Sequence, residues 1–155
     1  MVESKFGDLD NWQAMLNRHA ELFTEMTPGS SIGIVSRSSA GIQPGKRVAA
    51  LNNAGGGAEM LVWQVRDGHE GGMLAIRRSY SGFQEANVDL LFAADDSALD
   101  AIQDALQGET LSIMKRLIRK GNIMFYVMRT KYQLQDAGYE DFLDSLGLAF
   151  LGACR

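Results

Sequence analysis

Apolar residues recur at steps of three and four over residues 8–26, near the start of the chain. On an α-helix this spacing gathers the apolar side chains on one face, so it predicts an amphipathic helix. Asp8 or Asp10 can cap its start, and a Thr-Pro-Gly sequence after Met26 ends it. Residues 31–36 then form a candidate first strand.

Two β-rich segments, residues 59–66 and 73–78, flank a glycine-rich turn at residues 67–72. This arrangement predicts an antiparallel hairpin. Residues 88–93 are a further short apolar run, which predicts another strand. The Gly-, Ser- and Asn-rich residues 37–58 have the composition of a long loop, and such loops in small domains are often functional.

Two helices and an edge strand are predicted after these strands. Asp95 and the two residues that follow it can cap a helix that extends to about Leu106 and stops at Gly108. A second, short helix is expected over residues 109–114. The basic residues 115–120 partly alternate with apolar ones, and we expect them to form a strand at or near a sheet edge.

The period of the pattern changes at Gly121 and Asn122. The apolar, Met-rich residues 123–132 follow, and their spacing favours a helix that Asn122 caps. One long strand through Met128 is the alternative, because the run is also rich in aromatic and branched residues. After Gly138, residues 139–150 are expected to form a C-terminal helix.

Length and composition fit one globular domain over residues 1–155, because 46% of the residues are hydrophobic. A net charge of -4 and the scatter of the fifteen Lys and Arg argue against a nucleic-acid surface. Cys154 is the single cysteine, which fits a reducing compartment. With no apolar N-terminal segment and no run of about 20 apolar residues, a cytoplasmic location is expected.

No common catalytic arrangement accompanies these elements. The glycines before Ala58 lack the Lys-Ser/Thr of a phosphate loop. His19 lies on the apolar side of the first predicted helix and His69 in the hairpin turn, neither with partners at metal-ligand spacing. Cys154 lacks an activating base. We therefore expect no metal, no cofactor and no enzymatic activity.

Four basic residues and the methionines stand out instead. The basic residues are Lys115, Arg116, Arg119 and Lys120. They can contact anionic headgroups at a membrane surface, although a solvated strand face or charges that guard a sheet edge are simpler interpretations. Methionine is flexible and polarizable, so it fills irregular core gaps and also lines promiscuous apolar surfaces.

The order of elements resembles the sterol carrier protein type 2 family. Members of that family carry a strand that ends in Lys-Gly-Asp or Lys-Gly-Asn and leads directly into an apolar helix. Residues 117–124, which read Leu-Ile-Arg-Lys-Gly-Asn-Ile-Met, match this pattern, and residues 89–99 resemble the strand that runs into an acidic helix start. The resemblance covers residues 59–135, and the long segment 37–58 departs from it.

This resemblance implies an α+β fold with a curved, mainly antiparallel five-stranded sheet covered by helices. It also implies an apolar tunnel between sheet and helices for a fatty acyl, sterol-like or isoprenoid quinone ligand. Burial of apolar ligand surface stabilises such a complex by roughly 25 cal/mol per Å². We predict that Phe142, Leu146 and Phe150 form a lid, and that the tunnel is lined by Met114, Leu117, Ile123, Met124, Tyr126, Val127 and Met128.

Two alternatives are weaker. An interaction module or homodimer would use the apolar surface of the C-terminal helix, because exposed apolar patches commonly mark interfaces. A small enzyme that uses the turn around His69 or the long loop ranks last.

Overall fold

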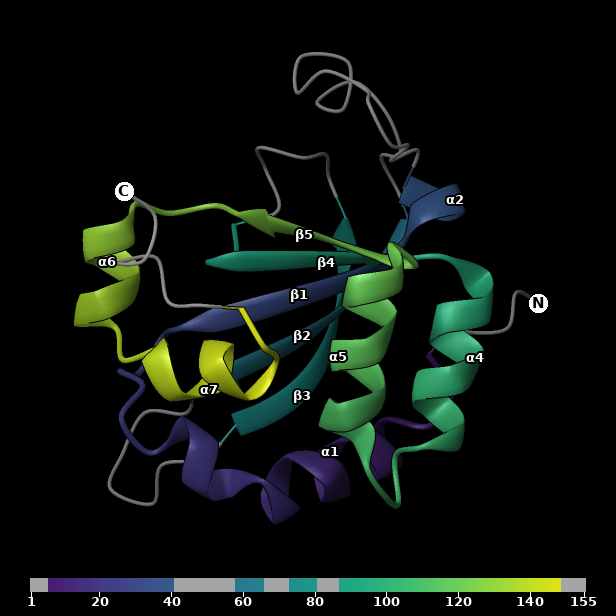
Figure 1. Cartoon of the computed structure of the whole chain (residues 1–155), viewed down its shortest axis with the longest axis horizontal. Helices are drawn as coiled ribbons and strands as arrows, with labels where there is room; N and C mark the ends of the chain where they lie inside the picture. Colours follow the sequence, from purple (N-terminus) through teal and green to yellow (C-terminus); the bar gives the residue numbers. More distant parts are fainter. Residues whose placement is uncertain (1–5, 41–57, 66–72, 81–86, 149–155) are drawn as a thin grey trace.

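The computed structural model describes residues 6–40, 58–65, 73–80 and 87–148 of the chain. Within these ranges, helices pack against a five-stranded sheet in an α+β arrangement (Figure 1). The strands are β1 (Ser31–Ser36), β2 (Ala58–Val65), β3 (Met73–Tyr80), β4 (Leu90–Ala94) and β5 (Ile123–Val127). The helices are α1 (Leu9–Arg18), the 3₁₀ helix η1 (Ala20–Phe23), α2 (Arg37–Ala40), α4 (Asp96–Asp104), α5 (Thr110–Lys120), α6 (Lys131–Asp136) and α7 (Glu140–Ser145).

The sheet is mixed and mostly antiparallel, with the strand order β3-β2-β1-β4-β5. Strands β1 and β4 run parallel, and the other three neighbouring pairs are antiparallel. Strands β3 and β5 therefore form the two edges of the sheet. Helices α5 and α7 lie in front of the sheet in Figure 1, on one of its faces, and α4 lies beside α5.

Several predicted elements are confirmed. Strand β1 has the bounds that its apolar pattern indicated, and β2 and β3 pair as the expected antiparallel hairpin. Strand β4 and helix α4 follow in the predicted order. The Asp95 carboxylate caps α4, because it accepts a hydrogen bond from the Ala98 N–H at 2.7 Å.

The N-terminal helix is shorter than predicted. Asp8 caps α1 by accepting from the Asp10 N–H, but the helix ends at Arg18 and the chain continues as the 3₁₀ helix η1. His19, with φ −105° and ψ 22°, lies outside the helical region and separates the two. Both α1 and η1 bury apolar side chains, so the apolar spacing continues from one helix into the other. The spacing alone therefore does not show that the α-helix ends at Arg18.

The prediction of a strand over residues 115–120 is wrong, because these residues complete helix α5. Leu111 and Met114 are buried on one side of α5, while Arg116 and Arg119 are exposed. The basic and apolar positions thus alternate with a helical rather than a strand period. Gly121 ends the helix at φ 86°, and the next N–H donates back to the Leu117 carbonyl at 3.0 Å.

The predicted helix over residues 123–132 is also wrong. Of the long strand through Met128 that was the alternative, only Ile123–Val127 forms a strand. Helix α6 begins separately after Thr130, which forms a capping box with Gln133. The C-terminal helix was predicted too long, since α7 ends at Ser145 before Gly147 at φ 74°. Helix α2 lies within the segment predicted as loop. His69, residues 41–57, Phe150 and Cys154 lie outside the described residues.

Candidate functional site

The apolar side chains form two clusters, one on each face of the sheet. The larger, which we call the helix-side core, combines strand residues with residues of α1, η1 and α4 to α7. The smaller, which we call the strand-face cluster, contains only residues on strands or within two positions of one. Its buried members are Val35, Met60, Val62, Tyr80, Val88, Leu91 and Ala93, and Ile76, Met124, Tyr126 and Met128 pack against them partly buried.

The residues predicted to line a tunnel are divided between these clusters. This division arises because several of these residues lie on or just after strand β5, and successive side chains of a strand point to opposite faces of the sheet. Met114, Leu117, Ile123, Phe142 and Leu146 belong to or pack against the helix-side core. Met124, Tyr126 and Met128 pack against the strand-face cluster, and Val127 is 39% exposed.

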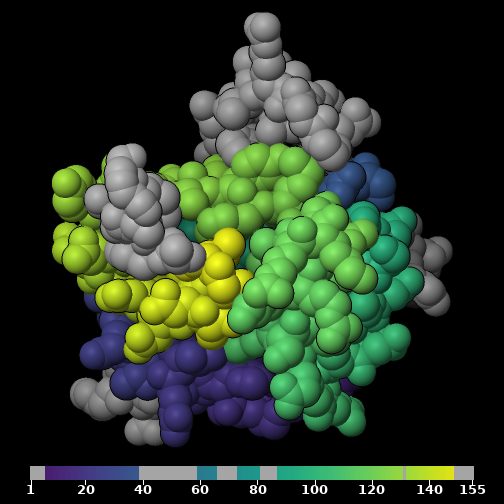
Figure 2. All heavy atoms as spheres, in the orientation of Figure 1, coloured from purple at the N-terminus to yellow at the C-terminus, as the bar shows by residue number. Residues whose placement is uncertain are grey.

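Aromatic rings fill the middle of the helix-side core. The ring of Phe142 lies 5.7 Å from that of Phe23, 6.2 Å from that of Trp63 and 6.5 Å from that of Phe92, measured between centroids. Trp12 adds a further contact to Trp63 at 6.2 Å. Each of these rings is at most 1% exposed. Figure 2 shows that the helices hide most of the sheet from this side.

The apolar side of α7, proposed above as an interaction surface, is occupied within the chain. Phe142, Leu143 and Leu146 are at most 2% exposed and belong to the helix-side core. The large apolar side chains exposed among the described residues are Val127 and Tyr132, on and after β5.

The strand-face cluster packs directly on the backbone of β1. A Cβ atom built on Gly33 would lie 2.9 Å from the Met60 sulfur, 3.2 Å from Leu91 Cδ1 and 3.3 Å from Val88 Cγ2. The absence of a side chain at Gly33 therefore lets residues of β2, of β4 and of the segment just before β4 meet over the central strand.

One buried polar atom of the strand-face cluster lacks a partner among the described residues. Tyr80 is 0% exposed, and its hydroxyl makes no hydrogen bond in the part of the chain described. His19 Nε2 and Trp63 Nε1 are likewise buried and without a hydrogen-bond partner among the described residues. Burial raises the pKa of Tyr80 to about 12, with a smaller contribution from the charge that Tyr126 would carry. The phenol is therefore neutral at physiological pH and able to act as a hydrogen-bond donor. The sequence prediction missed Tyr80, because it ended the strand two residues too early.

A second buried tyrosine, Tyr139, is fully paired at the opposite end of the sheet. Its hydroxyl donates to the Asp89 carboxylate at 2.6 Å and lies 3.2 Å from the Ser31 carbonyl. Asp89 also accepts from the Ser31 N–H at 3.1 Å and forms an ion pair with Arg129 at 3.1 Å. Burial, followed by the neighbouring carboxylate, raises the pKa of Tyr139 above its ordinary value. This network joins β1, β4, the end of β5 and α7, so we interpret it as structural.

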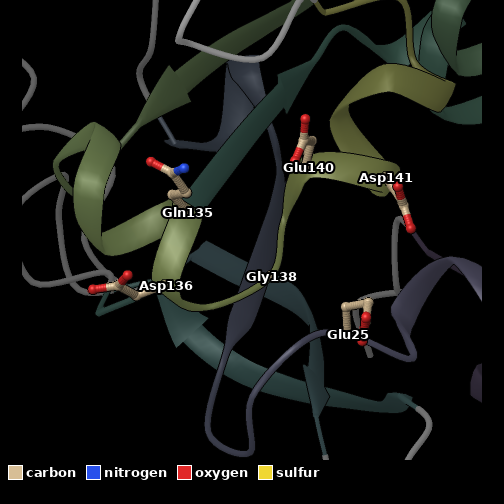
Figure 3. A pocket seen from close by; sticks show the side chains of 6 residues that line it. All are labelled: Glu25, Gln135, Asp136, Gly138, Glu140 and Asp141. Carbon is tan, nitrogen blue, oxygen red and sulfur yellow. The ribbon is translucent and has the colours of Figure 1, made fainter.

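A polar hollow of about 380 Å³ lies where α6 and α7 approach the turn after η1 (Figure 3). Its carboxylates point in different directions in Figure 3 rather than toward a common centre. It is too polar for a lipid chain, and no three Asp, Glu, His or Cys side chains among the described residues are placed to hold a metal ion. Its lining residues are Glu25, Gln135, Asp136, Gly138, Glu140 and Asp141.

The basic residues predicted to touch a membrane surface lie on α5. Arg116, Arg119 and Lys120 are exposed, and Lys115 is half-buried. Their position in the last turns of the helix also suits the helix dipole. Contact with anionic headgroups stays a prediction. None of the described helices has the length and hydropathy that a membrane span requires.

Comparisons with known proteins give one structural likeness. No protein-family model and no curated protein matches the chain. The solution structure of TT1886 from Thermus thermophilus, a conserved hypothetical protein suggested to be a sterol carrier protein, is similar with a TM-score of 0.41 and 16% sequence identity. The alignment covers 95% of this chain and 93% of that one.

Proposed function

We propose that the protein binds a lipid-like apolar molecule against the strand-face cluster and does not transform it chemically. The observation that carries this proposal is the make-up of the cluster. All five strands contribute to it, two methionines of β2 and β5 and a third directly after β5 take part, and no residue of a described helix belongs to it. Methionine adapts its shape to different apolar partners, which suits a loosely specific lipid site.

Solvent reaches this cluster at the margins of the sheet. The members on the central strands are at most 1% exposed, whereas Ile76 on β3 and Met124 and Tyr126 on β5 are half-buried. A ligand chain that displaced water from these margins would gain apolar burial without needing many polar contacts.

The proposal differs from the tunnel implied by the family resemblance in the face that it uses. A tunnel between sheet and helices would have to open among Trp12, Trp63 and Phe142, whose rings already pack together. The strand-face cluster retains three of the predicted lining residues, Met124, Tyr126 and Met128. The proposed ligand position is therefore on the other side of the sheet.

Two variants of β5 test the proposal. Protein from which bound lipid has been removed is titrated with a fluorescent fatty acid. Met124→Gln places a polar group on the strand-face cluster, and we expect about tenfold weaker binding, which corresponds to about 1.4 kcal/mol. Val127→Gln is the matched control, because it lies on the same strand, points to the opposite face and is also partly exposed. We expect its affinity to stay within about twofold of the original.

Two outcomes would overturn the proposal. The first is the lack of saturable binding to the unaltered protein, with no apolar molecule in organic extracts of the natively purified protein measured by mass spectrometry. The second is equal weakening by both variants, which would mean that the ligand binds elsewhere.

A further inference from the structure

The two edges of the sheet differ in what lies against their outward backbone groups. At the β3 edge, the Gln13 side chain of α1 donates to the Met73 carbonyl at 2.8 Å and accepts from the Ala75 N–H at 2.9 Å. The Gln13 amide therefore takes the place of a neighbouring strand. Strand β3 also carries Arg77 and Arg78, and charged side chains on an edge strand oppose pairing with another chain.

The β5 edge has neither form of protection in the described part of the chain. Strand β5 pairs with β4 on one side, and no strand of the described ranges lies on its other side. Its sequence, Ile-Met-Phe-Tyr-Val, contains no charged residue and no proline. Figure 1 shows β5 as the uppermost strand, with α5 and α7 below it. The outward backbone groups of such a strand are able to pair with another strand.

The backbone of β5 turns alternate residues toward β4 and toward the open edge. The Met128 N–H donates to the Asp89 carbonyl at 2.9 Å. The Asn122 carbonyl accepts from the Asp95 N–H at 3.0 Å. Hydrogen-bonded and non-hydrogen-bonded pairs alternate in an antiparallel ladder, so the even-numbered residues of β5 pair with β4 and the odd-numbered ones point their N–H and C=O groups outward. The outward residues are Ile123, Phe125 and Val127.

This outward row is complementary to itself about a twofold axis at Phe125. In an antiparallel pair of two β5 strands centred there, Phe125 faces its own copy, and Ile123 faces Val127 of the second copy. Each pair joins residues whose backbone groups point outward, so every outward N–H meets an outward C=O. A twofold axis uses the same surface on both copies. The pairing would also cover Val127, which is 39% exposed.

The side chains along β5 suit the same alignment. Met124, which is half-buried, lies opposite the half-buried Tyr126 of the second copy. Arg129 forms an ion pair with Asp89 of its own chain at 3.1 Å, and in the pair it would lie opposite the uncharged Gly121. Apolar side chains therefore face apolar side chains along the whole of β5, and the charge nearest to them is already neutralised.

We infer that two copies of the chain associate through antiparallel pairing of their β5 edges, centred on Phe125, into one continuous sheet. The inference does not depend on the proposed function, because backbone pairing needs no ligand. It also uses a different surface from the C-terminal helix, whose apolar side is buried within the chain. Because the strands pair edge to edge, the strand-face clusters of the two copies lie side by side in the dimer.

A proline at Val127 tests the pairing. The Val127 N–H points away from β4, so Val127→Pro removes an outward donor and leaves the hydrogen bonds to β4 intact, as edge strands tolerate. The twofold axis repeats this loss at both ends of the interface, and we expect the dimer Kd to rise about tenfold or more. Val127→Thr keeps the shape and the N–H and is the matched control, with a Kd within about twofold of the original. Sedimentation velocity over a range of protein concentrations measures both.

Amide hydrogen exchange of the unaltered protein gives a second measurement that needs no variant. The N–H groups of Phe125 and Val127 should gain protection as the protein concentration rises. Those of Met124 and Tyr126 pair with β4 and should stay equally protected at every concentration. Concentration-dependent protection of alternate residues is expected for strand pairing and not for a dimer that forms through another surface.

Three results would overturn the inference. One is a protein that stays monomeric at every concentration in the sedimentation experiment. Another is a dimer that Val127→Pro weakens no more than Val127→Thr does. The third is exchange at Phe125 and Val127 that does not change with concentration, which would mean that the β5 edge is open in the dimer or paired within one chain. If circular dichroism shows that Val127→Pro is unfolded, the exchange of the unaltered protein decides.

Discussion

The two faces of the sheet are both apolar, but they are built from different side chains. On the helix-side core, tryptophan and phenylalanine rings from α1, η1, β2, β4 and α7 contact one another at centroid distances of 5.7–6.5 Å. On the opposite face, methionine, valine, leucine and tyrosine side chains of the strands form the cluster. Interlocked rings give a single dense packing, whereas methionines adapt to what lies against them.

Under the proposed function, this difference assigns stability to one face of the sheet and ligand binding to the other. The helix-side core holds the helices onto the sheet and leaves little freedom for a ligand. The strand-face cluster contains the adaptable residues, two half-buried margins and a hydroxyl that is unpaired within the described part of the chain. Strand β5 contributes to both, since Ile123 and Phe125 face the helices while Met124 and Tyr126 face the other way.

The largest expected effect comes from removing a ring of the helix-side core. Phe142→Ala should lower the free energy of unfolding by about 3–5 kcal/mol, because it leaves a cavity among three aromatic neighbours. Met124→Ala, on a half-buried side chain of the other face, should cost about 1 kcal/mol or less. Urea unfolding followed by tryptophan fluorescence measures both. A cost below about 1.5 kcal/mol for Phe142→Ala would indicate space in this core and return the ligand site to the helix-covered face.

A smaller effect is expected from the paired tyrosine. Tyr139→Phe removes the donor from Asp89 and the hydrogen bond that ties α7 to the sheet, so it should lower the free energy of unfolding by about 1–3 kcal/mol. Tyr80→Phe removes an unpaired hydroxyl and should leave that free energy unchanged or raise it slightly. Thermal unfolding of both variants in parallel gives the comparison. Equal destabilisation would mean that the Tyr80 hydroxyl has a structural partner in the folded protein.

Much of the sheet could be predicted from the sequence. Strand β1 and the β2–β3 hairpin stand out because short β-rich runs are bounded by turn residues, and α4 because Asp95 is a strong cap. The pairing of β1 with β4 could not be predicted in this way, since it joins segments far apart along the chain and depends on the packing of the whole sheet.

The segment around Gly121 shows what the pattern left ambiguous. The sequence marks the break at Gly121, but the elements on either side are the reverse of those predicted, with helix before it and strand after it. Two signals favoured the observed order: the basic residues repeat at helical spacing, and Thr130 with Gln133 forms a capping box that starts a separate helix. A short apolar run alone fits a strand and a buried helix equally well.

The candidate site was predicted less well than the fold, for the same reason. On a helix, Ile123, Val127 and Met124 would lie near one face, whereas on a strand Met124 points away from the other two. An error in the type of element therefore divided the predicted lining between two faces. Tyr80 could not be singled out, because its significance lies in an unpaired hydroxyl that no sequence pattern reveals.

The smallest expected effect concerns the attachment of the helix layer to the sheet at Asp95. Its carboxylate accepts hydrogen bonds from Asn122, from the Ala98 N–H and from Ser97. Burial raises the pKa of this carboxyl, but the hydrogen bonds outweigh it, so the pKa lies below the ordinary value of 3.8. Because the folded-state pKa is depressed, the stabilisation is complete above about pH 4 and is lost as the pH falls through the folded pKa.

Asp95→Asn keeps a cap but removes the titrating group, so it should flatten the dependence of stability on pH below about pH 4. Asp95→Ala should cost about 1 kcal/mol at neutral pH through loss of the cap. Urea unfolding at low pH and at neutral pH measures both changes, with Asp104→Asn at the other end of α4 as the control. Fatty-acid binding at neutral pH should be unaffected by Asp95→Asn, because the residue anchors the helix-covered side. Weakened binding by that variant would mean that the two faces are coupled through β5 rather than independent.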